Sequence, residues 1–137
     1  VNPGAIASCL YRVLLPKGVA WAKDNIIKEI RRNLIWSLEK LCFSKESYQD
    51  GSKVLALLAA AENETWGNNA TGQFKQLFHI MLPGTEATLQ ERLETLHYLK
   101  ISGKEYEELA LECFDRAFDN GSFVRDGSGA QFGLQRN

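Results

Sequence analysis

Apolar residues recur at intervals of three and four along most of this chain, and that spacing leaves few folds open to it. The clearest run lies between Asn25 and Phe43, where one stripe carries Ile26, Ile27, Ile30, Leu34, Leu38 and Leu41. Such spacing forms the buried face of an amphipathic α-helix, and no stretch alternates in the way that marks a convincing strand. The sequence therefore predicts an all-α protein.

Helix starts and stops divide the first half of the chain. Pro3 suits the first turn of a helix, because its missing N–H needs no partner there. Pro16 and Gly18 end that helix, and its stripe is Ile6, Leu10, Val13 and Leu14. Asp24 is the expected N-cap of the Asn25–Phe43 helix, and Ser44 that of the next. The next helix carries a buried stripe of Val54, Leu55, Leu57, Leu58 and Ala61. Gly51 lies near its start, so either this helix begins later or a second helix approaches closely there.

Similar signals divide the second half. Asn68 or Asn69 is expected to cap a helix over Ala70–Leu82, which Pro83–Gly84 ends, with Phe74, Leu77, Phe78 and Met81 inside. Thr88 and Glu91 have the spacing of a capping box. The helix behind that box has Leu89, Leu93, Leu96 and Leu99 as its stripe, and Ser102–Gly103 ends it. A last amphipathic helix is expected from Lys104 to Asp119.

The total is about six helices with short connections, which makes neighbours in sequence antiparallel neighbours in space. Paired this way, they form hairpins of roughly 40 residues, the period of HEAT-like helical repeats. We expect either such a solenoid or an irregular helical bundle. Residues 1–121 are predicted to form one helical domain, and the Gly-rich residues 122–137 a tail or the start of a further unit.

Composition excludes several classes of function. The formal net charge is −1, which offers no general electrostatic attraction for nucleic acid. A specific contact through Arg12, Lys28, Arg31 and Arg32 stays open as an alternative, although Arg31–Arg32 fits an ordinary solvated helix face. No apolar run reaches the roughly 20 residues of a membrane span, so we expect no membrane partner. The three cysteines, Cys9, Cys42 and Cys113, fit buried thiols of a cytoplasmic protein. The chain begins with Val1, which suggests a piece of a longer protein.

Candidate chemistry is sparse. Glu62, Glu64, His79 and His97 could supply a general base or a small metal-dependent hydrolase-like site, with the histidines facing each other across a hairpin. No HExxH spacing or second histidine at helical spacing supports this, so we expect structural roles, with no catalytic residue, metal or cofactor.

The segment from Glu62 to Glu86 is the main departure from the helical pattern. Its predicted loop contains Trp66 and a pair of asparagines, which is more than a simple turn requires. The candidate binding residues are Glu64, Trp66, Asn68, Asn69 and Thr85. Trp36 lies off the stripe of the strongest helix and is expected to be buried, with that helix covered on two sides.

Parts of the chain resemble a known kind of region. The resemblance rests on residues 31–41, 54–59, 68–74 with 77–79, and 82–87 with Glu91 and Arg92. They are similar to the α-helical, HEAT-like region of large uncharacterised bacterial proteins, some of which carry a signal-transducing NTPase module elsewhere. The resemblance implies a helical segment of a longer protein, with a sensor or regulatory region beside an NTPase as the expected context, and it assigns no catalytic residue.

The expected function is therefore a non-enzymatic, helical protein-interaction or scaffold domain. Its partner would be another protein or a neighbouring domain of the same chain. The predicted surface comprises the loop at residues 62–70 and the turn at residues 83–87.

Overall fold

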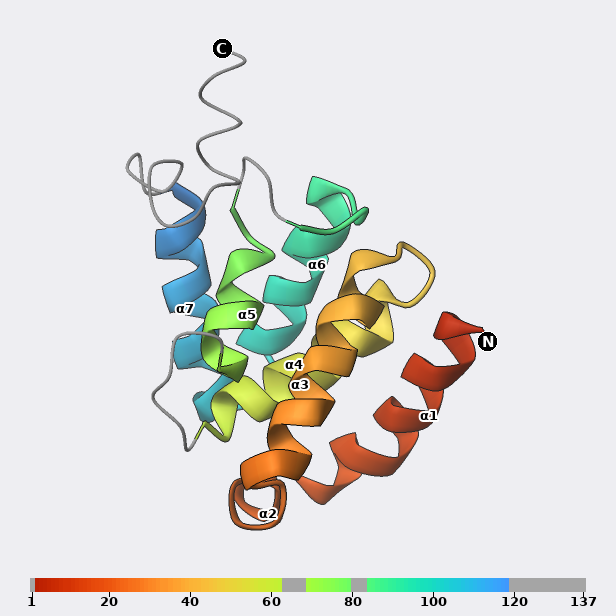
Figure 1. Ribbon diagram of the computed structural model, residues 1–137. Coiled ribbons are helices and arrows are strands. Elements are labelled where there is room, and N and C mark those ends of the chain that lie inside the picture. Colours follow the sequence, from red (N-terminus) through yellow and green to blue (C-terminus); the bar gives the residue numbers. More distant parts are fainter. Residues whose placement is uncertain (1, 63–68, 80–83, 119–137) are drawn as a thin grey trace.

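The structure, a computed structural model, describes residues 2–62, 69–79 and 84–118, with side chains up to residue 115. The described ranges contain seven α-helices, one 3-10 helix and no strand (Figure 1). They are α1 (Pro3–Leu14), η1 (Leu15–Lys17), α2 (Val19–Asn25), α3 (Lys28–Phe43), α4 (Tyr48–Ala60), α5 (Ala70–Gln76), α6 (Leu89–Lys100) and α7 (Lys104–Phe118). The all-α prediction is confirmed.

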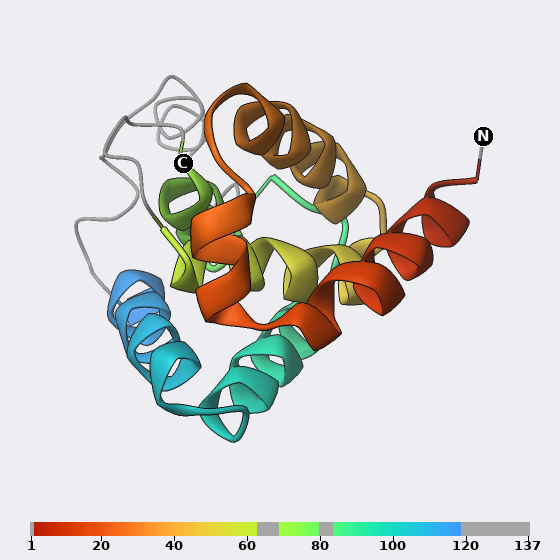
Figure 2. The ribbon, with the colours of Figure 1, turned by 90° about the horizontal axis from the view of Figure 1, so that it is seen from below.

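Helix α4 is the centre of the fold. It contacts α1, α2, α3, α5, α6 and α7, and Figure 2 shows it running between them. Its expected stripe is fully buried, and Ala56 and Ala59 are buried as well. Lys53 and Asp50 are its only charged residues, so nearly every face can be covered by another helix. Helices packed around one central helix form a helical bundle. The repeat arrangement stays a prediction.

Gly51 marks the closest approach of α3 and α4. A Cβ at this position would lie 3.3 Å from the Cβ of Leu41. Gly51 is buried inside α4, which begins at Tyr48, so the second of the two predicted explanations is confirmed. The prediction that Ser44 caps α4 is wrong. Ser44 follows the end of α3, and Ser47 is the N-cap residue, with its hydroxyl donating to the Leu41 carbonyl at 2.6 Å.

The buried face of α3 differs from the predicted stripe. Asp24 lies within α2 rather than at the start of α3. Ile26 and Ile27 connect the two helices, so α3 begins at Lys28. The buried side chains of α3 are Arg31, Ile35, Leu38, Leu41 and Cys42. Ile30 is 69% exposed and Trp36 is 53% exposed, so the expected burial of both is wrong. Helix α3 packs on α4 with one face and leaves its outer face uncovered.

Helix α1 begins as expected, with Pro3 in the first turn and the Asn2 side chain accepting from the Gly4 N–H at 2.9 Å. Its predicted stripe is rotated, however. Ala7 is the buried residue and Ile6 and Val13 are exposed, because small Ala7 allows α1 to lie close against α4. Cys9 on α1 is exposed, which corrects its expected burial, whereas Cys42 and Cys113 are buried.

Helices α5 and α6 start where predicted. The Asn69 side chain caps α5 by accepting from the Gly72 N–H at 2.8 Å, and Thr88 and Glu91 form the capping box of α6. Helix α5 ends at Gln76, earlier than expected, although Phe74, Leu77 and Phe78 are buried as predicted. Leu89 and Leu93 are exposed, because Arg92 and Thr95 share the buried face of α6 with Leu96 and Leu99. Met81 and residues 122–137 lie outside the described residues.

None of the described helices is long and apolar enough to cross a bilayer.

Candidate functional site

The predicted binding residues divide into two groups. Glu64, Trp66 and Asn68 lie outside the described residues. Asn69 and Thr85 are described, and both hold the backbone. Asn69 caps α5, and the Thr85 hydroxyl donates to the Cys42 carbonyl and accepts from the Ala87 N–H at 3.1 Å.

The turn at residues 84–87 is docked on the end of α3. The last carbonyls of a helix lack partners within it, so they need donors from elsewhere. Thr85 supplies one to Cys42, and the Glu86 N–H donates to the Phe43 carbonyl at 2.7 Å. In return, a Glu86 carboxylate oxygen accepts from the Lys45 N–H at 3.0 Å. Gly84 has a φ of 75°, which allows the chain to enter this turn. These contacts place Glu86 beside the α3–α4 loop.

A cavity of about 670 Å³ lies at this junction. It is lined by Ser44, Lys45, Glu46, Gln49, Asp50, Glu86 and Glu91. Three segments thus meet there: the α3–α4 loop with the start of α4, the docked turn, and the first turn of α6, which follows that turn closely in sequence. A second hollow of about 190 Å³ shares Gln49 and Glu91 with it and adds Lys53, Glu94, Thr95 and Tyr98. We call the two together the acidic groove.

The acidic groove carries five carboxylates, Glu46, Asp50, Glu86, Glu91 and Glu94, against Lys45 and Lys53. The Lys53 ammonium is already engaged, since it lies 4.5 Å from the ring centre of Tyr98 and 5.6 Å from that of Tyr11. The hydrogen bond from the Thr88 backbone to Glu91 lowers the pKa of that carboxyl, which keeps it ionised. The groove is therefore an anionic surface at neutral pH.

Two buried arginines, Arg31 and Arg92, hold helix ends in place. The Arg31 side chain is 0% exposed. It donates to the carbonyls of Leu58 at 2.6 Å and Ile26 at 3.3 Å, and it lies 3.1 Å from a carboxylate oxygen of Glu62. The other Glu62 oxygen accepts from the N–H and the hydroxyl of Thr71, at 2.9 and 3.0 Å. This network joins α3, the end of α4 and the start of α5, and it corrects the prediction that Arg31 lies on a solvated face.

Arg92 likewise donates hydrogen bonds to backbone carbonyls, in this case those that follow α5. Its guanidinium donates to the carbonyls of Leu77 and His79, each at 3.0 Å, where α5 has ended. Burial lowers the pKa of Arg92, and the nearby Tyr48 opposes that shift. Burial raises the pKa of Tyr48 itself, whose hydroxyl lies 3.1 Å from that of Thr95. Helical register is the sequence feature that could have indicated the burial of both arginines. Arg31 precedes Ile35 by four residues and Arg92 precedes Leu96 by four, so each arginine lies on the same helix face as a buried apolar residue.

The predicted histidine and carboxylate site does not assemble among the described residues. His79 is buried after α5, His97 is exposed on α6, and Glu62 is held by Arg31 and Thr71. In the described part of the chain, no group of three or more His, Cys, Asp or Glu side chains is placed to hold a metal ion. Glu64 lies outside that part. Of the four residues considered for nucleic-acid contact, Arg31 is buried, whereas Arg12, Lys28 and Arg32 are exposed.

Sequence reasoning identified the turn beside the groove but missed the groove itself. Its carboxylates fall into two groups, Glu46 and Asp50 in one and Glu86, Glu91 and Glu94 in the other, which are 36 residues apart, and each alone has the appearance of an ordinary surface residue. Only the docking of the turn brings them together.

No protein-family model, curated protein or solved structure matches this chain.

Proposed function

We propose that this chain is a non-enzymatic helical interaction domain that binds a basic segment of another protein, or of a neighbouring domain, in the acidic groove. The single observation that supports this is the meeting of five carboxylates around two adjoining hollows, which share Gln49 and Glu91. Like charges kept close together favour a ligand of opposite charge, which relieves their repulsion on binding.

The construction of the groove also suits binding. Two of its carboxylates are held in place by backbone hydrogen bonds, Glu86 from Lys45 and Glu91 from Thr88. Preorganised charges lose less conformational entropy when a partner arrives. Residues 84–87 of the predicted surface adjoin this groove, so the proposal keeps one part of the expected surface and specifies that its partner is basic. A place in the cytoplasm and a regulatory role beside an NTPase remain expectations that accompany this proposal.

Binding of a fluorescent oligolysine peptide tests the proposal. We expect the wild-type chain to bind it, with an affinity that falls as salt screens the charges. The variant Glu46→Gln with Asp50→Asn should weaken binding about tenfold, which is the effect of removing two charges from the centre of the groove. A chain that binds the peptide no better than a variant lacking these charges would refute the proposal.

A matched control variant is Glu105→Gln with Glu108→Gln on α7. These residues are exposed and lie outside the groove, and Glu105, like Asp50, is in the first turn of its helix. Both variants raise the net charge by two, so a specific groove predicts a loss of affinity in the first variant only.

A further inference from the structure

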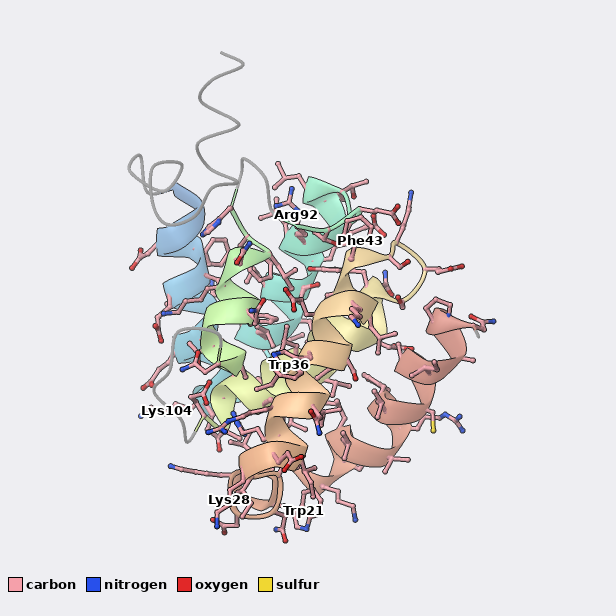
Figure 3. All side chains as sticks on the ribbon, in the orientation of Figure 1. Trp21, Lys28, Trp36, Phe43, Arg92 and Lys104 are labelled. Carbon is pink, nitrogen blue, oxygen red and sulfur yellow. The ribbon has the colours of Figure 1, made fainter. Side chains whose placement is uncertain are left out.

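The two ends of α3 carry opposite charge. The acidic groove adjoins the end at Phe43, and Figure 3 shows Phe43 far from Trp21 and Lys28, which are at the opposite end of the molecule. At that end, α2 runs between the end of α1 and the start of α3 (Figure 2). Residues 12–28 contain four basic side chains and one acidic side chain.

This basic end is also apolar. We define it by exposed Lys17, Lys23 and Lys28 together with the exposed apolar residues Trp21 and Ile27. The Lys17 ammonium lies 5.0 Å from the centre of the Trp21 ring. Trp21 is 37% exposed and Ile27 is 40% exposed, and aromatic residues are enriched in protein interfaces.

The backbone at Lys28 supports a role for its side chain. Among the described non-glycine residues, Lys28 alone has a positive φ, 55°. A glycine would adopt this conformation without strain, so the structure tolerates a local conformational cost in keeping a lysine there. Strain of this kind is found where a side chain serves a function.

The acidic end of the molecule is complementary to the basic end in charge and also carries exposed apolar side chains. Phe43 and Leu89 are exposed beside the groove. Phe43 precedes Ser44, which lines the groove, and Leu89 lies in the same helix turn as Glu91. Each end of the molecule thus combines exposed apolar side chains with charges, and the charges are opposite in sign.

We propose that this chain associates head to tail with a second copy, so that the basic end of one molecule occupies the acidic groove of the next. The proposal rests on the proposed function, in which the groove binds basic segments. The contact pairs two different surfaces at opposite ends of the molecule. Such a heterologous contact does not close after two copies and adds further copies in a line.

Sedimentation velocity tests this association. At about 0.01 M salt the weight-average sedimentation coefficient should rise as protein concentration is raised toward about 1 mM, and at about 0.5 M salt the rise should disappear. An end variant, Lys17→Glu with Lys28→Glu, and a groove variant, Glu46→Lys with Asp50→Lys, should each remain monomeric.

Mixing the two variants gives the decisive result. The end variant keeps an intact groove and the groove variant keeps an intact basic end, so a mixture should form dimers and nothing larger. A mixture that stays monomeric overturns the proposal, and so does a wild-type chain that is monomeric at every concentration. Lys28→Gly, which relieves the positive φ, should keep the melting temperature and still weaken association.

Peptide binding separates failure of the two proposals. The end variant should bind oligolysine as well as the wild type does, because its groove is unchanged. Wild type that binds oligolysine yet never self-associates overturns only the head-to-tail contact, and wild type that does neither overturns both. Wild type that stays monomeric but sediments with phosphatidylserine vesicles, in a manner that depends on Lys28, overturns the contact in favour of a lipid surface.

Discussion

The replacement Glu62→Ala should destabilise this fold far more than the loss of an ordinary surface carboxylate. Arg31 is fully buried and Glu62 is 18% exposed, so the pair is largely removed from water. Taking away one partner of a buried pair leaves an uncompensated charge, which costs about 3–5 kcal/mol. The partial exposure of Glu62 places the expected loss at the lower limit, about 3 kcal/mol, or a fall of about 10 °C in melting temperature.

Urea unfolding followed by circular dichroism measures this loss, and two further variants sharpen it. Glu62→Gln removes the charge but keeps an oxygen for Thr71, so it should cost roughly half as much. The double variant Arg31→Met with Glu62→Ala should lose less than the sum of the single losses, because no buried charge is then left alone.

Glu112→Ala is the matched control. Glu112 pairs with Lys75, but their side chains are 54% and 25% exposed. Exposed pairs contribute about 0–1 kcal/mol, so this variant should be nearly neutral. A Glu62→Ala loss no larger than that of Glu112→Ala would refute the idea that Arg31 depends on Glu62.

Three other predictions concern helix ends, packing and pH. Thr88→Ala removes the hydroxyl that accepts from the Glu91 N–H at 3.1 Å, and it should cost about 1 kcal/mol in chemical unfolding, with Thr88→Ser nearly neutral. Gly51→Ala gains about 1 kcal/mol of helix propensity but places a Cβ 3.3 Å from Leu41; we expect a net loss of about 1 kcal/mol, and a gain would show that α3 and α4 can separate freely. Burial raises the pKa of Tyr106 to about 12, against about 10 in the unfolded chain. Its contribution to stability is therefore complete below about pH 10 and is lost as pH rises toward 12. Ultraviolet titration of tyrosinate and alkaline unfolding of Tyr106→Phe check this, since the variant should unfold at higher pH.

The sequence by itself determined six of the seven described helices and many of their boundaries, but it did not predict α2 as a separate helix. Caps are local, because the side chain of Asn69 or Thr88 reaches a backbone N–H only three residues away. Proline and glycine stops are local in the same sense. The central stripe of α4 was also readable, because a helix that is apolar on nearly every face has to be buried.

Only the tertiary structure decided which face of an ambiguous helix is covered. In α3, Ile30 and Arg31 are neighbours, and hydropathy alone favours burial of the isoleucine. The structure buries Arg31 instead, because carbonyls at the end of α4 and the carboxylate of Glu62 satisfy its guanidinium. Those partners are 27 and 31 residues away, and no local pattern reports them.

The acidic groove has the same origin. Its carboxylates come from the α3–α4 loop, the start of α4, the docked turn and α6, and the turn docks because the last carbonyls of α3 lack donors within their own helix. Local spacing thus set where each helix begins and ends, whereas long-range satisfaction of helix ends and buried charge set how the helices meet and where their charges gather.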